Sequence, residues 1–232
     1  MALATPFTEK TDEQRAITEM VRQFVDNEVL PIAEEHDHED TFPEAVVEQM
    51  KELGLFGVTI PEEYGGMGLD LTTYAMIVEE LSRGWISVSG IVNTHFIGSH
   101  LLMKFGTDEQ KDHFLPRMAT GEVRAAFSLS EPECGSDVQG IKSTAQKLDS
   151  GDWELNGQKM WVTNGLRSGV VFVLMKTDPK ADPPHRGMTC FITEKEPGAE
   201  ENDGLRVPPK IKKMGYKGVE STELVFDGFK AR

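Results

Sequence analysis

The chain has 232 residues, 38% of them hydrophobic, and a formal net charge of −15. This length and apolar content can bury a core, which excludes an intrinsically disordered chain. The acidity is uneven, because residues 1–123 hold 8 basic and 23 acidic side chains whereas residues 124–232 hold 16 of each. Since phosphate contacts need a basic face, the charge argues against nucleic-acid binding.

The chain contains two cysteines, Cys134 and Cys190, which are too few for a disulfide framework or a metal cluster. Residues 1–14 lack a basic segment followed by an apolar stretch, so we expect no secretory signal. No run approaches eighteen apolar residues, so we expect no membrane span. Together these features predict a soluble, cytoplasmic protein.

The first half of the chain has helical periodicity. Thr11 and Gln14 fit a capping box, and apolar residues at helical spacing continue from there to Val25. A second capping box, at Thr107 and Gln110, begins another helix. The expected helices cover about 11–25, 43–53, 71–83, 87–105 and 107–118.

Beyond about residue 121 the pattern changes to short alternating runs. Residues 150–152 predict a tight hairpin turn, and 178–187 and 196–204 predict exposed loops. Because no helix-length spacer separates the runs, an antiparallel barrel or sandwich is expected rather than a parallel βαβ sheet. The predicted fold is α+β, with an all-helical domain over 1–122 and a β domain over 123–232. The expected strands cover 123–130, 143–149, 153–165, 170–178, 188–194 and 221–229.

Two patterns that can indicate chemistry have a simpler structural explanation. The glycine-rich run Gly65, Gly66 and Gly68 lacks the preceding strand and following helix of a dinucleotide-binding loop, so we expect a turn. His36 and His38 lie in an acidic run with no matching pair of ligands at i, i+4, so we expect a solvated surface and no metal site.

Two segments of the β half form a candidate binding site. Residues 130–137 (SEPECGSD) follow an apolar run and turn sharply, which exposes backbone N–H groups suited to an anion such as a pyrophosphate. Residues 160–165 place Trp161 and Thr163 at the end of another run, and an aromatic beside a hydroxyl suits a flat ring with polar edges. On these residues alone, two ordinary hairpin ends are an equally weighted alternative.

Four motifs, in order along the chain, resemble those of the acyl-CoA dehydrogenase family. They are PEEYGGMGL at 61–69, SEPxxGSD at 130–137, NGQKMWVTNG at 156–165 and KMGYKGVESTELVFD at 213–227. The resemblance covers nearly all of the chain. It implies a helical domain and a β-barrel-like middle domain, followed in the family by a C-terminal four-helix domain beyond Arg232. It also implies an oligomer, usually a homotetramer, with a hetero-oligomer as the alternative.

The resemblance implies FAD-dependent oxidation of an acyl-CoA thioester to a 2-enoyl-CoA. In the family a carboxylate removes the α-proton, a β-hydride passes to flavin N5, and an electron-transfer flavoprotein accepts the electrons. The family's catalytic glutamate belongs to the C-terminal domain, and Glu79, Glu80 and Glu131 do not match it. We therefore assign no catalytic residue and no metal ligand here. A non-catalytic subunit or inactive fragment stays open, as does an oxidase or monooxygenase on the same scaffold.

The resemblance also assigns the residues of the first flavin-binding segment. Phe127, Leu129 and Ser130 look like the strand that edges the isoalloxazine ring. Ser130 stands where the family usually has threonine, and it keeps the hydroxyl. Gly135 and Ser136 resemble the pyrophosphate-binding turn, with Ser136 also near the acyl-CoA substrate.

The second flavin-binding segment is assigned in the same way. Trp161 resembles the aromatic side chain that flanks the ring, and Val162 belongs to the same cofactor-binding run. Thr163 resembles the hydroxyl donor to flavin N5. Such donors stabilise negative charge that arrives on the reduced ring.

Overall fold

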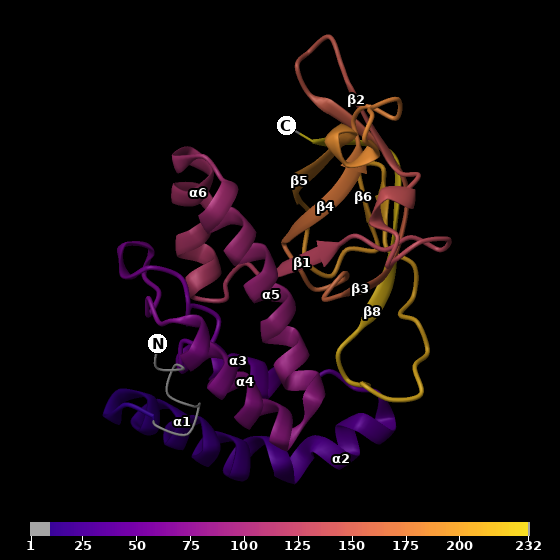
Figure 1. Ribbon diagram of the computed structural model, residues 1–232. Coiled ribbons are helices and arrows are strands. Elements are labelled where there is room, and N and C mark those ends of the chain that lie inside the picture. The colour runs from indigo at the N-terminus through magenta and orange to yellow at the C-terminus, as the bar shows by residue number, and fades with distance from the viewer. Residues whose placement is uncertain (1–9, 232) are drawn as a thin grey trace.

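The computed structural model describes residues 10–231, in which helices form one half and strands the other (Figure 1). Residues 1–9, most of the segment in which we expect no secretory signal, lie outside the described residues, as does Arg232. The helices are α1 (Asp12–Phe24), α2 (Leu30–Glu39), α3 (Glu44–Glu52), α4 (Leu71–Gly84), α5 (Ile86–Phe105) and α6 (Asp108–Ala119), and a π-helical turn, Val25–Val29, joins α1 to α2. Short 3-10 turns cover Glu62–Tyr64, Val138–Gly140 and Pro184–Gly187.

The helix ends follow the local sequence. Thr11 accepts a hydrogen bond from the backbone of Gln14 at 3.1 Å, and the Gln14 side chain accepts one from the backbone of Thr11 at 3.1 Å. Thr107 and Gln110 make the same reciprocal bonds at the start of α6. Both predicted capping boxes are therefore present, and each satisfies two backbone N–H groups that the helix leaves free.

The helix α5 connects the two halves of the molecule. Along its first turns Val88 and Ile91 are fully buried in the helical core, which also contains Met50 and Ile77. Near its end Leu102 packs in a second cluster with residues of α6, β1 and β4. Because α5 is buried against both helices and strands, it can present side chains directly to the ends of the strands.

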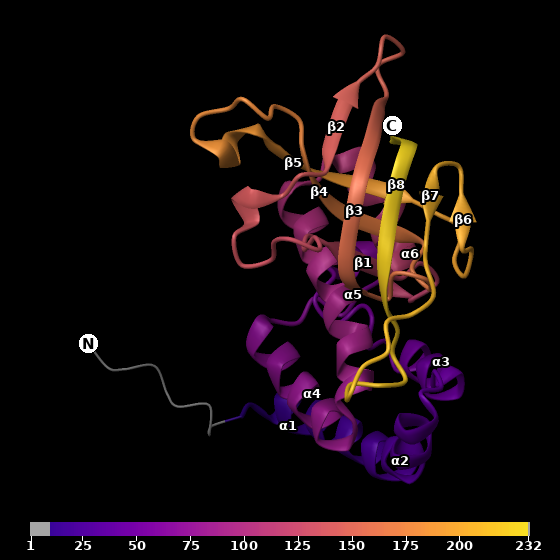
Figure 2. The same cartoon turned by 90° about the vertical axis from the view of Figure 1, so that its right-hand side faces the viewer.

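The sheet has the strand order β1-β4-β2-β3-β8-β7-β6, with β5 paired to β4. The paired β3 and β8 are its longest strands and lie side by side in Figure 2. Its core includes Leu155, Val162, Val171 and Leu224. The strands are β1 (Ala125–Ser128), β2 (Thr144–Lys147), β3 (Trp153–Thr163), β4 (Val170–Lys176), β5 (Met188–Glu194), β6 (Glu201–Asn202), β7 (Leu205–Arg206) and β8 (Ser221–Ala231).

The predicted α+β class, helices followed by a curled sheet, is confirmed, but the sheet is mixed and not purely antiparallel. Strand β1 runs parallel to β4, from the pair Ala125–Val170 to the pair Ser128–Val173, and β2 also meets β4 in parallel. The loop after β1 leads the chain back, so β2 runs in the same direction as β1. The chain then reverses between β2 and β3 and again between β3 and β4, so β4 runs parallel to β1 and β2. Alternation along one strand does not reveal the direction of its neighbour, so this pairing was not predictable from the pattern.

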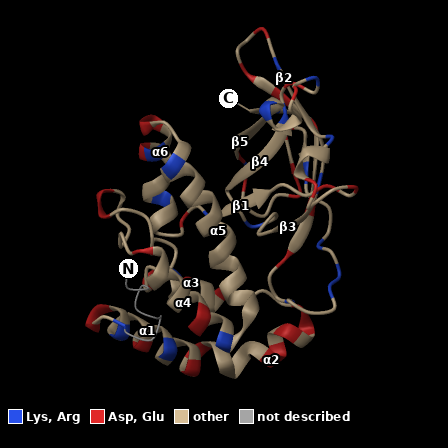
Figure 3. Ribbon diagram, in the orientation of Figure 1, with Lys and Arg blue, Asp and Glu red and all other residues tan. Residues whose placement is uncertain are grey.

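Acidic side chains gather on the helical half, notably along α1 and α2 (Figure 3). The run that contains His36 and His38 forms the end of α2, where Glu34, Glu35 and Glu39 are exposed. The glycine-rich run at 65–68 forms a turn, with Gly65 and Gly68 at φ values of 82° and 64°. None of the helices within residues 10–231 is long and apolar enough to cross a membrane.

Candidate functional site

A hollow of about 270 Å³ lies where the ends of β1 and β3 meet α5. The helix contributes an apolar side chain and a hydroxyl, and the two strand ends contribute aromatic, aliphatic and hydroxyl groups. Five of the eight residues predicted to bind the cofactor lie together here, although they come from two separate motifs. The lining residues are Thr94 and Ile97 from α5, Phe127 from β1, Leu129 and Ser130 directly after it, and Met160, Trp161 and Thr163 from β3.

The other three predicted residues lie around this hollow. A Cβ placed on Gly135 would come 3.5 Å from the Ser130 hydroxyl, so the turn borders the lining, and Ser136 beside it is exposed. The Val162 side chain is only 1% exposed and packs in the core of the sheet. A ligand in the hollow could therefore contact Val162 only through its backbone.

Trp161 has an unusual backbone conformation for a large residue. Its φ is 62°, in the left-handed region, and its side chain is 55% exposed. The register between β3 and β8 shifts between Lys159 and Val162, so a bulge redirects Trp161 out of the alternation. A strained, exposed aromatic costs free energy of about 1–3 kcal/mol. Such an arrangement is typical of a binding site, because the fold gains no buried contact from it.

The turn after β1 leaves two neighbouring backbone donors free. Glu131 and Cys134 bond each other across the turn, with N–H to carbonyl distances of 2.8 and 3.3 Å. Within residues 10–231, the N–H groups of Gly135 and Ser136 have no protein acceptor. Successive free N–H groups in a turn can bind an anion, which is the chemistry predicted for this segment.

A buried ion pair that was not predicted from the sequence connects the two segments. The Lys159 Nζ lies 2.8 Å from a Glu131 carboxylate oxygen, and it also donates to the Leu129 carbonyl at 3.2 Å. Glu131 accepts two further bonds, from the backbone of Lys142 at 2.6 Å and of Ser143 at 3.0 Å. Lys159 on β3 thus bonds both to Leu129, directly after β1, and to Glu131 in the turn that follows.

The pKa values of Glu131 and Lys159 are shifted by burial and by the hydrogen bonds around the pair. Burial opposes the charged form of Glu131, but the hydrogen bonds from Lys159, Ser143 and Lys142 outweigh it and hold the carboxyl pKa below its ordinary value. Burial lowers the pKa of Lys159, and the Glu131 carboxylate opposes that shift. The alternation of β3 contained a signal for this pair, because Lys159 shares the inward face of Leu155, and a buried lysine needs an acidic partner.

A second, larger cleft of about 540 Å³ lies between α5 and β5. Leu101, Phe105, Phe172 and Ile192 are among the residues that line it, and none of the predicted site residues does. The smaller hollow is therefore the better candidate, since it combines a strained aromatic, hydroxyl groups and free backbone donors at one place.

Family models for the acyl-CoA dehydrogenase N-terminal domain and middle domain match residues 11–122 and 126–229. The chain belongs to the acyl-CoA dehydrogenase family. It is 36% identical over 226 residues to (2S)-methylsuccinyl-CoA dehydrogenase of Cereibacter sphaeroides, which covers 95% of this chain and 41% of that enzyme. The family assignment agrees with the resemblance seen in the four motifs.

Solved structures of the family share the fold. Butyryl-CoA dehydrogenase from Megasphaera elsdenii has a TM-score of 0.89 at 29% identity, over 100% of this chain and 58% of that one. An acyl-CoA dehydrogenase of Bacillus anthracis, solved in complex with FAD, has a TM-score of 0.85 at 34% identity, over 98% of this chain and 37% of that one. The chain spans about half the length of the curated relatives it matches.

Proposed function

We propose that this acyl-CoA dehydrogenase family chain holds FAD for the oxidation of an acyl-CoA thioester to a 2-enoyl-CoA. The observation that carries the proposal is the hollow lined by Trp161 and Thr163, bordered at Ser130 by the turn with the free backbone donors of Gly135 and Ser136. A flat ring and an anionic group in one ligand match this combination, and FAD has both.

The residues fit FAD in two parts. Gly135 and Ser136 would hold the pyrophosphate through their free N–H groups, because a negative charge suits a turn with successive free donors. Trp161, which is exposed at the hollow, would lie against the isoalloxazine ring. The hydroxyls of Ser130 and Thr163 donate to its polar edge and stabilise negative charge on the reduced ring. When bound, FAD supplies the acceptor for the hydride equivalent.

We propose that Ser136 also contacts the acyl-CoA substrate, because its side chain is exposed at the end of the anion-binding turn. An electron-transfer flavoprotein is the proposed acceptor of the electrons, and an oligomer the proposed assembly. A chain that holds flavin without catalysing the reaction is the second candidate. It is favoured by one observation: the residues that line the hollow carry no carboxylate and no imidazole.

Substituting Gly135 by valine is expected to weaken FAD binding at least tenfold, or about 1.4 kcal/mol. The backbone tolerates the new side chain, since a Cβ at this position meets nothing closer than 3.5 Å. The loss would come from the side chain occupying the space next to the free donors. Affinities are measured by titrating flavin fluorescence, with FAD and with riboflavin, which has the same ring but no pyrophosphate.

The wild type is expected to prefer FAD to riboflavin, and Gly135→Val to remove that preference while leaving riboflavin binding unchanged. Ser150→Val, in the exposed turn between β2 and β3, serves as the control and should leave both affinities unchanged. Full FAD affinity in a folded Gly135→Val protein would refute the pyrophosphate assignment.

A further inference from the structure

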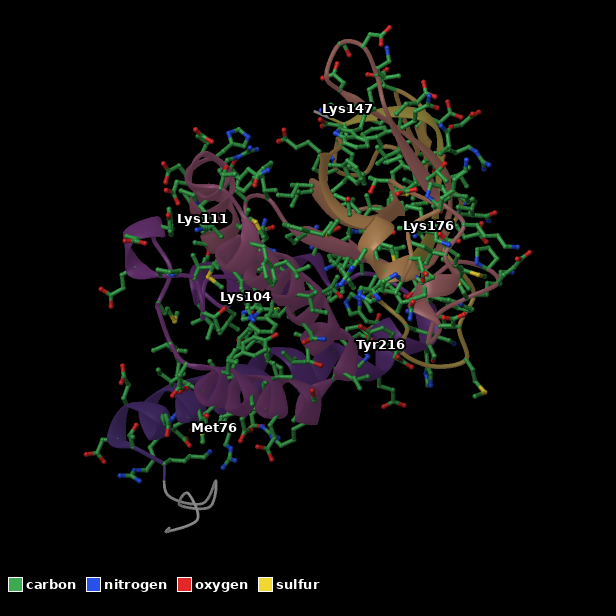
Figure 4. All side chains as sticks on the ribbon, turned by 45° about the horizontal axis from the view of Figure 1, so that its top comes forward. Met76, Lys104, Lys111, Lys147, Lys176 and Tyr216 are labelled. Carbon is green, nitrogen blue, oxygen red and sulfur yellow. The ribbon has the colours of Figure 1, made fainter. Side chains whose placement is uncertain are left out.

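The side chain of His95 joins the helix α5 to the first strand of the sheet. It is fully buried, and its Nδ1 atom accepts the backbone N–H of Ala125, the first residue of β1, at 3.1 Å. A Cβ placed on Gly98, one turn further along α5, would come 2.7 Å from the Cβ of Ala125. Side chains of both halves fill the space between the helices and the sheet in Figure 4. The helix and the strand are therefore in direct contact, and the histidine bond fixes them at this point.

This bond requires an uncharged imidazole. A neutral ring carries one proton, and because Nδ1 accepts from Ala125, that proton is on Nε2. Nε2 is buried and has no hydrogen-bond partner within residues 10–231. A second proton would go to Nδ1, where it would face the N–H of Ala125. Two donors would then meet in a buried site, and the bond between α5 and β1 would be lost.

The surroundings of the ring also oppose a positive charge. The ring of Phe56 meets it edge to face, with the centroids 5.3 Å apart. Burial lowers the pKa of His95 to about 4, the charge of Arg124 acts in the same direction, and the backbones of Phe56 and Met118 oppose the shift only in part. Of the described elements around the ring, β1 is preceded by the charged Arg124, whereas α6 and the segment before α4 contribute Met118 and Phe56, which do not titrate. His95 is therefore neutral at neutral pH.

The two elements that His95 joins also line the hollow. Thr94 precedes His95 on α5 and is a lining residue. Phe127 lies two residues after Ala125, on the same face of β1, and is another. A change in the distance between α5 and the start of β1 would therefore change the width of the hollow between Thr94 and Phe127.

We propose that His95 is a positioning residue: its neutral ring holds β1 at a set distance from α5, and acid releases the strand by protonating the ring. The contact between helix and strand does not depend on a ligand. Its consequence for flavin binding rests on the proposed function, because that part assumes that FAD binds in the hollow.

The expected pH dependence follows from the direction of the pKa shift. The ordinary pKa of a histidine is 6.5, so the unfolded chain takes up this proton before the folded chain does as the pH falls. The stability that the neutral ring contributes is present above pH 6.5 and is lost as the pH falls toward 4. Between pH 7 and pH 5, His95 alone should lower the folding equilibrium constant about twentyfold.

The first test is urea unfolding of the 232-residue chain at these two pH values, without added FAD. His95→Asn offers an amide oxygen as acceptor in place of Nδ1 and does not titrate. Its folding equilibrium constant should fall about twentyfold less than that of the wild type, since all other groups contribute equally to both proteins. His185→Asn, at an exposed position, is the matched control and should follow the wild type. Equal pH dependence in the wild type and His95→Asn would refute the acid-sensitive contact.

Nitrogen NMR of the histidine-labelled wild type tests the same contact without a variant. At pH 7 the spectrum of His95 should show a proton on Nε2 and none on Nδ1, because Nδ1 accepts from Ala125. A proton on Nδ1 at this pH would contradict the proposal.

The effect on the hollow is tested by FAD titration at pH 7. His95→Ala removes the acceptor and should weaken FAD binding at least about tenfold, whereas His95→Asn should stay within about threefold of the wild type. Wild-type FAD affinity in a folded His95→Ala protein would refute the positioning role and leave the proposed function standing. If the wild type does not bind FAD, the proposed function fails and the role at the hollow fails with it. The unfolding comparison then still decides whether His95 holds β1 to α5.

Discussion

Lys159→Met is expected to lower the free energy of unfolding by about 3–5 kcal/mol, because it leaves the Glu131 carboxylate buried without its partner. Both side chains are almost fully buried, at 0% and 5% exposure, so water cannot replace the lost bond. The effect is measured by equilibrium urea unfolding followed by circular dichroism. Since the pair fastens the turn at residue 131 to β3, we also expect weaker FAD binding in the folded variant.

A matched control is available in the same turn. Lys142 pairs with Glu133, but both side chains are mostly exposed, and an exposed pair contributes about 0–1 kcal/mol. Lys142→Met should therefore cost far less than Lys159→Met. Replacing Glu131 together with Lys159 should recover only part of the loss, because the backbone N–H groups of Lys142 and Ser143 would lose their acceptor. Equal costs for Lys159→Met and Lys142→Met would contradict the role of the buried pair.

The 232-residue chain loaded with FAD is expected not to oxidise acyl-CoA at a measurable rate. Removal of the α-proton needs a base within hydrogen-bonding reach of the reacting atoms, and a positioned base contributes roughly 10²–10⁴ to the rate. The described residues that line the hollow include no group able to take this role. The measurement supplies acyl-CoA substrates of increasing chain length and an artificial electron acceptor to the FAD-loaded chain.

The control for this experiment is FAD binding itself, which should persist while turnover is absent. Thioester binding is measured in parallel, by titrating the flavin absorbance of the loaded protein. Turnover above background that a single Glu→Gln change within the chain abolishes would show that the base lies in this chain. The proposed division, with flavin held here and the base supplied from elsewhere, would then be wrong.

The sequence predicted most elements because their signals are local. The run 188–194 matches β5 at both ends, and the predicted helix over 87–105 differs from α5 by one residue at its start. The helix α2 was not predicted, because most of its residues are acidic or polar and its few apolar residues do not recur at helical spacing. The two-residue strands β6 and β7 are too short to show alternation, and β6 lies within the predicted loop 196–204.

Residues of the candidate site could be predicted only where they belong to a local sequence motif. Residues 127–130 and 161–163 form local motifs, and the structure brings them to one hollow. The contributions of Thr94 and Ile97 were not predictable, because they depend on how α5 packs across the ends of the strands.

The location of the flavin ring is the central claim, and methyl NMR of the labelled chain tests it most directly. Addition of FAD is expected to shift the methyl signals of Ile97 and Thr163, which line the hollow from α5 and from β3. The methyl signals of Ile17, on α1 and packed against the helical core, should not move. Saturable shifts at Ile97 and Thr163 would support the account. Unchanged signals at both residues in the presence of excess FAD would contradict it.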